Sequence, residues 1–529
     1  MRYLNKVYLF TFILFSTSFT YLKAQNIDIN AFGYYNEAIR FSQTSFTGTA
    51  RFQGLAGAAA SLGGDVSSAA INPAGLGFFR KSELSFTPAF GFNNSSTEYL
   101  GETTSDSRFN MNLSNLAVVF ASPKDGLSVN KGGAFSISLS RINDFHNEIT
   151  YQGVNTETQI VDYFLEQADG VPWTVLDEQG ESGNLTTLGL AYFTYLINPD
   201  YFEDPGEQDS YVTYIGLVPT AQQETIKSKG AQYEWNISYG GNLDDTFYYG
   251  VGLGIQTLRY SRDREYSETI NDTEPNMTDL LFIDRLSQSG IGVNLKAGVI
   301  YRPIDAVRVG VSFISPTWYS ITESYSEEMY VSYDNLVIPV GFEDGEVITK
   351  RLSNENVVPP PYEDLTFSLK TPYRLNAGVS FFFGKIGFVS VDGEYVAYNS
   401  ASLNKPRYKI DGADAGFNFD ADNRTIEKNF AQTVNLRIGT EFRIKHLRLR
   451  GGFAYYSDPQ ADSNLLASSH KYFTTGIGFR NQKFYTDFTL VGDFFKKERE
   501  PYTLFTRPNP TASAKLSKVR ALFSFGVFF

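Results

Sequence analysis

The sequence predicts an all-β fold: a transmembrane antiparallel β-barrel of about 14 strands, with an N-terminal hatch that plugs its lumen. Three observations predict it. Apolar and polar residues alternate along most of the 529-residue chain, as they do in strands with two different faces. The connections between these strands are short and long in turn, and the stretch from Arg51 to Phe79, before the first strand, is instead rich in glycine and alanine.

Residues 1–24 have the pattern of a secretory signal peptide. Arg2 and Lys6 precede an apolar stretch from Val7 to about Phe19, and the small residue Ala24 stands at the expected cleavage site. The stretch is shorter than the roughly 20 residues that a membrane-spanning helix needs. The sequence therefore predicts export to the cell outer membrane.

Composition disfavours other classes. The chain has 45 basic and 58 acidic residues, a net charge of -13 that becomes about -16 without Arg2, Lys6 and Lys23, and this balance disfavours nucleic acid as a partner. There is no cysteine, so a small disulfide-stapled fold is not expected. The 34 tyrosines and 45 phenylalanines suit the aromatic girdles of a membrane barrel.

The predicted hatch covers residues 25–81. Within it, a helix-like Gly/Ala piece (Gly54–Leu62) precedes a Gly-Gly-Asp turn (Gly63–Asp65), a small polar run and then Asn72-Pro73-Ala74. This order resembles the N-terminal hatch of the FadL/TodX-type family of outer-membrane transporters, whose members carry an Asn-Pro-Ala motif. A glycine-rich surface loop is the plain alternative; a nucleotide site is weaker, because the glycines do not fall in a G-x-G-x-x-G pattern and no strand precedes them.

The barrel is predicted over residues 82–529. Its candidate strands are 82–94, 109–121, 132–142, 230–240, 246–261, 289–302, 306–319, 373–383, 386–398, 430–444, 446–457, 470–480, 483–495 and 515–529. Short links such as Gly241–Asp245 alternate with long ones such as 143–229, 262–288 and 320–372, which places the short links and both termini on the periplasmic side. Pro88 and Pro316 fall within candidate strands, where proline indicates a bulge or a strand end.

Alternation in the sixth strand places Ile291, Val293, Leu295 and Val299 on the lipid side, and the tenth does the same with Val434, Leu436, Ile438 and Phe442. The last strand ends at Phe529, resembling the terminal signal by which bacterial barrels are recognised by the insertion machinery. Family members have a kinked third strand that opens the wall sideways. Here 132–142 has its glycines at the start and no proline, so no lateral exit is predicted.

The resemblance implies passive uptake of hydrophobic molecules, such as long-chain fatty acids or aromatic hydrocarbons, by a monomer among outer-membrane lipids, with Asn72, Pro73 and Ala74 in the gating hatch. The alternative is an interaction or protein-secretion component that uses the same barrel to dock exported proteins. A general diffusion porin is disfavoured, because it needs no hatch of small residues.

Two sets of ligand-contacting residues are predicted. In the long loop 143–229, Phe164, Leu165, Leu188 and Tyr192 lie on apolar helical faces that would catch a hydrophobic ligand, or would simply pack on one another. Lys296 and Arg374 face the lumen beside small neighbours and would pair with a ligand carboxylate, unless interior acids neutralise them. We predict no catalytic residue, no metal site and no cofactor.

Overall fold

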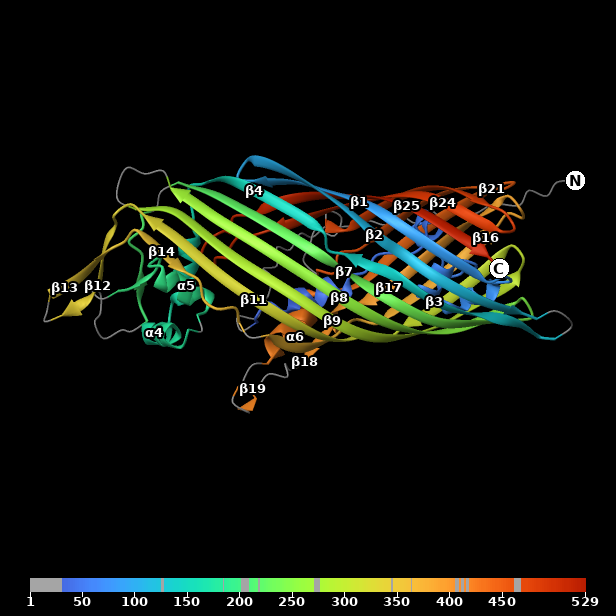
Figure 1. Ribbon diagram of the computed structural model, residues 1–529, viewed down its shortest axis with the longest axis horizontal. Helices are drawn as coiled ribbons and strands as arrows, with labels where there is room; N and C mark the ends of the chain where they lie inside the picture. The colour runs from blue at the N-terminus through green and yellow to red at the C-terminus, as the bar shows by residue number, and fades with distance from the viewer. Residues whose placement is uncertain are drawn as a thin grey trace, which may run out of the picture.

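The computed structural model describes residues 31–529 except 125–127, 184, 201–208, 217–218, 271–275, 344–345, 363, 405–408, 411–412, 415–417 and 461–467. The predicted signal peptide lies outside the described residues. The chain forms a closed antiparallel barrel of 14 strands (Figure 1). The first strand, β1, pairs with the last, β25, from Glu83↔Phe528 to Glu98↔Ser513, which closes the wall.

Ten positions in the wall hold one continuous strand and four hold two consecutive segments. The single strands are β1 (Glu83–Tyr99), β2 (Glu102–Pro123), β7 (Thr220–Leu243), β8 (Phe247–Ile270), β9 (Met277–Ile304), β21 (Gln432–Ile444), β22 (Leu447–Tyr456), β23 (His470–Arg480), β24 (Phe484–Arg499) and β25 (Ala512–Phe528). The divided ones are β3 (Asn130–Asp144) with β4 (Asn147–Asn155), β10 (Val307–Ile314) with β11 (Trp318–Tyr333), β15 (Leu365–Lys370) with β16 (Arg374–Phe382), and β17 (Gly387–Ala397) with β18 (Ser402–Asn404).

The wall confirms the predicted alternation. Ile291, Val293 and Leu295 are 57%, 44% and 58% exposed on its outer face, whereas Asn294 and Lys296, which alternate with them, are buried inside. Both prolines act as predicted: the β1–β2 register shifts at Thr87/Pro88, and Pro316 lies in the break between β10 and β11. The outer face is therefore apolar and the lumen polar, as a barrel in lipid requires. No helix within the described ranges is long and apolar enough to cross a membrane.

The strands are much longer on one side of the barrel than predicted. β7 and β8 each have 24 residues and β9 has 28, whereas β17, β22 and β23 have 10 or 11. Segments 262–270, 277–288 and 320–333, predicted as outer loops, are therefore parts of strands. The predicted long loop after the first strand is also wrong, because a tight turn at Leu100 and Gly101, both with positive φ, joins β1 directly to β2.

The third strand bends although it has no proline. Its ladder with β2 ends at Asn115↔Ser140, while its ladder with β7 continues, with a register shift at Arg141/Asn143, and resumes through β4. Side chains replace the lost backbone bonds: Asp106 accepts the Thr150 N–H at 2.7 Å, and Ser95 donates to the Glu148 carbonyl at 2.8 Å. Among the described strands no backbone ladder joins β2 to β4, and side chains of β1 (Ser95) and β2 (Asp106) bond to β4 over this stretch.

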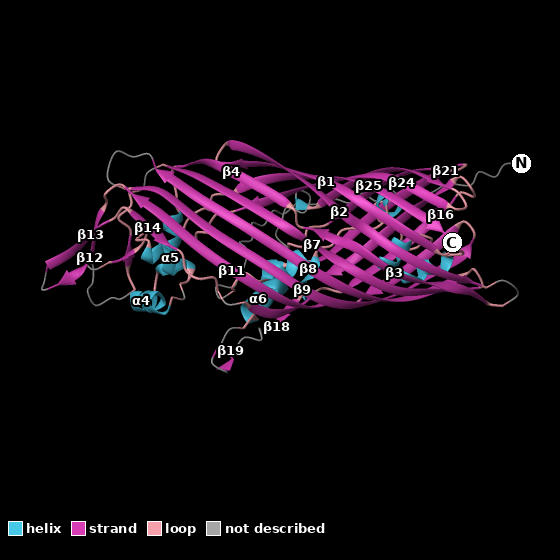
Figure 2. Ribbon diagram, in the orientation of Figure 1, coloured by secondary structure: helices cyan, strands magenta, loops and turns pink. Residues whose placement is uncertain are grey.

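The hatch lies inside the barrel, where Figure 2 shows its helices within the ring of strands. Its helical segments are α1 (Tyr35–Ser42), α2 (Ala50–Gly54), η1 (Val66–Ala70) and η2 (Pro73–Phe78). The helix predicted at 54–62 is wrong: the helix ends at Gly54, and Ala56 and Gly57 both have positive φ, which a continuing helix cannot accommodate. The predicted turn at 63–65 is present, with Gly63 and Gly64 at φ 70° and 69°.

The outer end of the barrel is covered by a cap that surrounds one apolar cluster. Its helices are α3 (Ile160–Ala168), α4 (Trp173–Ser182) and α5 (Thr187–Phe193). A further helix, α6 (Asp420–Asn429), lies near the middle of the barrel's length (Figure 1) and contacts η3 (Tyr398–Ser400). Minor strands are β5 (Asn198–Pro199), β6 (Tyr211–Val212), β12 (Val337–Glu343), β13 (Glu346–Arg351), β14 (Asn354–Val357), β19 (Lys409–Ile410) and β20 (Ala413–Asp414). The β12–β13 hairpin projects beyond the cap.

Candidate functional site

Asn72 anchors the hatch to the wall. Its side chain is fully buried and donates from Nδ2 to the Ala60 carbonyl at 2.7 Å and to the Val299 carbonyl of β9 at 3.1 Å. Its Oδ1 accepts the Ala74 N–H at 3.1 Å and so caps η2, whose first residue is Pro73. The predicted Asn-Pro-Ala motif therefore forms a turn that bonds to the hatch and the wall together.

Two wall glycines let the hatch backbone approach this closely. A Cβ atom at Gly298 of β9 would lie 2.1 Å from Asn72 Oδ1, and one at Gly310 of β10 would lie 2.1 Å from the Ala60 carbonyl oxygen. Any side chain at either position would push the hatch from the wall. The contact site between hatch and wall, called the seat of the hatch below, is therefore formed by residues of the barrel as well as by residues of the hatch.

Single polar bonds hold the rest of the hatch to strands around the barrel. Asp392 of β17 accepts the Ala60 N–H at 2.7 Å, the hydroxyls of Ser61 and Ser380 lie 2.6 Å apart, and Thr489 of β24 donates to the Ala50 carbonyl at 2.7 Å. Arg51 pairs with Glu441 of β21 at 3.2 Å. These contacts are directional and can exchange with water or a ligand.

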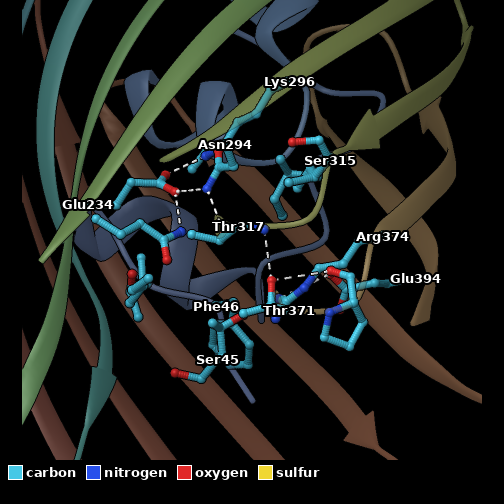
Figure 3. Close-up of a pocket in the computed structure, with 18 of the residues that line it drawn as sticks. Ser45, Phe46, Glu234, Asn294, Lys296, Ser315, Thr317, Thr371, Arg374 and Glu394 are labelled. Carbon is cyan, nitrogen blue, oxygen red and sulfur yellow. Dashed lines mark hydrogen bonds and ion pairs between the residues drawn. The ribbon is translucent and has the colours of Figure 1, made fainter. Parts of the chain in front are cut away.

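Lys296 and Arg374 both line a small inner cavity beside the hatch, with a volume of about 90 Å³ (Figure 3). Neither is a free cation. Lys296 is 4% exposed and forms an ion pair with Glu234 of β7, which also accepts from Gln256 at 2.7 Å. The sequence identified these two cations as facing the lumen, and Glu234 is the interior acid that it could not assign to Lys296.

Arg374 contacts the hatch itself. Its guanidinium donates to the Thr44 hydroxyl and the Ser42 carbonyl, and it lies 3.8 Å from Glu394. It therefore holds the linker between α1 and α2, residues 43–49, against the wall. The linker makes a backbone contact with the bent third strand as well, because the Ser45 N–H donates to the Ile142 carbonyl at 3.3 Å.

A larger outer cavity, of about 260 Å³, lies on the other side of the linker. Thr44, Ser45 and Tyr456 line both cavities, so the linker separates them. The outer cavity combines apolar surface from Phe145, Ile149, Ile226 and Leu516 with several cations. Sequence reasoning missed Lys497 because the predicted thirteenth strand ended at residue 495, and it did not single out Lys518 although the predicted last strand, 515–529, contains it.

The four predicted outer-loop residues belong to the cap. Phe164 is 1% exposed in the apolar cluster of the cap, against which Leu165, Leu188 and Tyr192 pack while partly exposed. The alternative that these faces pack on one another therefore holds for Phe164. The other three remain candidates for contact with a ligand at the outer surface.

The three histidines lie apart. His146 contacts Asp144 at 3.0 Å, His470 contacts Asp493 at 3.0 Å, and His446 lies 3.2 Å from the Arg480 carbonyl. Within the described part of the chain, no group of three or more His, Cys, Asp or Glu side chains is placed to hold a metal ion.

The fold is similar to that of a solved Pseudomonas aeruginosa FadL homologue. The TM-score is 0.52 at 12% sequence identity, over 91% of this chain and 98% of that one. The toluene transporter TbuX of Ralstonia pickettii also matches, with a TM-score of 0.46 at 13% identity over 92% of this chain and 99% of that one. No protein-family model and no curated protein matches the sequence. The chain has the fold of a FadL-type barrel, at an identity that establishes fold alone.

Proposed function

We propose that this protein takes up hydrophobic molecules passively across the outer membrane, and that the hatch moves to open their path. The molecules taken up would be long-chain fatty acids or aromatic hydrocarbons. The observation that carries the proposal is the arrangement of the two cavities, which adjoin at Thr44 and Ser45 of the hatch linker and at Tyr456 of the wall. Displacing this linker would join them into one passage that leads toward the seat of the hatch.

Lys296 and Arg374 are the proposed ligand contacts on this passage. Arg374 is held by Ser42 and Thr44 of the hatch, so a linker that moves would release its guanidinium toward a ligand carboxylate. Lys296 would contribute by exchanging part of its pairing with Glu234. In the closed hatch both cations are compensated, which avoids uncompensated charge beside the hatch.

The remaining parts of the proposal concern export, insertion into the membrane, oligomeric state and the first contact with a ligand. Export would use the signal peptide cleaved near Ala24, and the terminal strand that ends at Phe529 would be the segment bound by the insertion machinery. The barrel would work as a monomer surrounded by outer-membrane lipids, with no enzymatic activity. Leu165, Leu188 and Tyr192 would provide the first apolar contact outside.

A reversible covalent lock tests the moving hatch. The chain has no cysteine, so Ser61→Cys with Ser380→Cys introduces the only two thiols, at hydroxyls that lie 2.6 Å apart between the hatch and β16. Uptake of a radiolabelled fatty acid and of toluene is measured in cells that express the variant, before and after reduction. We expect uptake to fall to background when the pair is oxidised and to recover when it is reduced.

A wall-to-wall pair is the matched control. Ser380→Cys with Ser390→Cys joins β16 to β17 at hydroxyls 3.0 Å apart and leaves the hatch free, so uptake should not respond to oxidation. Unchanged uptake in the locked hatch variant would contradict a moving hatch and direct attention to the stretch of wall between β2 and β4.

The docking alternative is supported by the projecting β12–β13 hairpin. Val337, Val347 and Ile348 on it are 46%, 44% and 41% exposed, which is unusual for apolar side chains in water. Deleting residues 337–351 should leave small-molecule uptake unchanged if the barrel is a transporter. Loss of an exported protein from the cell surface, with uptake absent in the parent protein, would favour the docking alternative.

A further inference from the structure

The outer cavity collects positive charge in a protein that is acidic as a whole. Six cationic side chains line it but only two carboxylates do, although the chain carries a net charge of -13. The cations are Arg40, Arg262, Lys497, Arg499, Lys518 and Arg520, and the carboxylates are Asp144 and Asp493.

Three of the six cations are compensated by acids behind the cavity surface. Arg40 pairs with Glu37 at 2.5 Å, Arg262 with Asp284 at 2.6 Å, and Arg499 with Glu224 at 3.1 Å. The two lining carboxylates are also engaged, since Asp144 pairs with Arg141 at 2.8 Å and Asp493 contacts His470 at 3.0 Å.

The other three cations that line the outer cavity are Lys497, Lys518 and Arg520. None of them has a carboxylate within 4.0 Å among the residues that the structure describes. All three face the lumen from two neighbouring strands, because the ladder pairs Lys497 with Ala514, Asp493 with Lys518 and Val491 with Arg520. Lys518 and Arg520 are two residues apart on one face, about 7 Å along the strand, which their side chains easily bridge.

Apolar groups lie within the same set. Phe495 and Leu516 form the ladder pair between Lys497 and Lys518, and the Lys518 Nζ lies 5.7 Å from the centre of the Phe495 ring. Lys518 therefore leans toward Lys497, and Ile149 and Leu516, which belong to one apolar cluster, line the same cavity as both lysines. A ligand bound in this cavity would contact positively charged and apolar side chains at the same time.

Like charges placed close together in one cavity repel one another, and a bound anion relieves that repulsion. A single carboxylate would neutralise one of three charges. A phosphate monoester carries about 1.5 to 2 negative charges near neutral pH and has three acceptor oxygens, which suits an arginine fork with two lysines.

We propose that the outer cavity binds an amphipathic anion with a doubly charged headgroup, of the alkyl phosphate monoester class, through Lys497, Lys518 and Arg520. This inference rests on the proposed function, because it names the ligand class of the same passage. The headgroup would lie against β24 and β25, and the alkyl chain against Phe145, Ile149 and Ile226.

Binding to the full chain in nanodiscs of zwitterionic lipid tests the headgroup separately from the chain. Octyl phosphate, octanoate, octanol and inorganic phosphate are titrated by calorimetry, with empty nanodiscs as background. We expect octyl phosphate to bind about tenfold more tightly than octanoate, and octanol and inorganic phosphate to bind more weakly than either.

The variant Lys497→Gln/Lys518→Gln/Arg520→Gln should lose the preference for phosphate over carboxylate. The matched control, Lys496→Gln/Lys515→Gln, removes two lysines that pair across the same two strands but face outward, and should retain the preference. If the triple variant does not insert, Lys518→Gln alone should reduce the preference severalfold.

Two other results overturn the inference, and a third separates it from the proposed function. Octanoate binding as tightly as octyl phosphate excludes a doubly charged headgroup but leaves hydrophobic uptake standing. Inorganic phosphate binding as tightly as octyl phosphate indicates a plain anion site. Octyl phosphate that binds as proposed while the hatch lock has no effect on uptake refutes the moving hatch and not the cavity.

Discussion

Replacing Asn72 by alanine should loosen the hatch while leaving the barrel intact. The change removes the donors to Ala60 and Val299 and the acceptor that caps η2, three hydrogen bonds at 2.7–3.1 Å around a fully buried side chain. A buried hydrogen bond contributes about 0.5–1.5 kcal/mol net, so the loss amounts to about 2–4 kcal/mol. That loss would raise the open fraction of the hatch by about 30-fold to 700-fold.

Native-state hydrogen exchange measures this directly. Peptides from residues 50–79 should lose about 2–4 kcal/mol of protection, whereas peptides from β9 and β21 keep theirs, because the hatch opens as a unit separate from the wall. The matched control is Asn435→Ala. Asn435 is also buried, but its amide bonds only Glu394 at 3.0 Å and the Ser457 N–H at 3.2 Å.

Two results would refute the reasoning. Hatch peptides that exchange as slowly in Asn72→Ala as in the parent would mean that Asn72 contributes nothing to the seat. Equal loss of protection in every strand would mean that the hatch and the barrel unfold together, so that no separate opening exists for a ligand to use.

Further predictions concern the wall, the cap and pH. Gly298→Ala should release the hatch as Asn72→Ala does, because its Cβ would lie 2.1 Å from Asn72 Oδ1, whereas Gly393→Ala, with no atom within 4 Å, should not; hydrogen exchange of residues 50–79 compares them. Phe164→Ala should destabilise the cap by about 3–5 kcal/mol, seen as faster proteolysis of residues 160–193, with the barrel unchanged in a heat-modifiability gel. Desolvation favours protonation of Glu166, but hydrogen bonds from the Thr506 hydroxyl and the Phe505 and Thr506 N–H groups outweigh it and lower the pKa of Glu166. Its contribution is therefore present above the ordinary glutamate pKa of about 4.3 and is lost as the pH falls through the lower folded value, so exchange of residues 500–511 should rise in acid in the parent and lose this pH dependence in Glu166→Gln.

The barrel was predictable because lipid imposes a repeated pattern on every strand that it surrounds. Val293 and Leu295 alternate with Asn294 and Lys296, and the same pattern recurs around the wall. The outer halves of β7 and β8 carry no such pattern. Gln222 and Gln223 are both polar although one faces inward and the other outward, and the outer halves of these two strands were therefore missed.

The bend in the third strand could not be predicted for another reason. No proline or glycine marks it, and its cause is distant in sequence: Asn143 donates to the Gln43 carbonyl of the hatch at 2.8 Å, and Ile142 accepts from Ser45. The ion-pair partner of Lys296 could not be predicted for a similar reason. That Lys296 faces inward follows from local alternation, but its pairing with Glu234 depends on the register between strands that loops of unknown geometry connect.

In the proposed mechanism, two barriers in the lumen separate binding of a ligand from its passage. The first barrier is the linker at Thr44 and Ser45, which lies between the outer and inner cavities; the second is the part of the hatch that Arg51, Ser61 and Asn72 bond to the wall. A disulfide between positions 61 and 380 fixes the second barrier and leaves the first free. The oxidised lock variant should therefore bind octyl phosphate with parental affinity in nanodiscs while it fails to transport. Loss of binding on oxidation would mean that linker and seat move as one body, and the two cavities would then open only together.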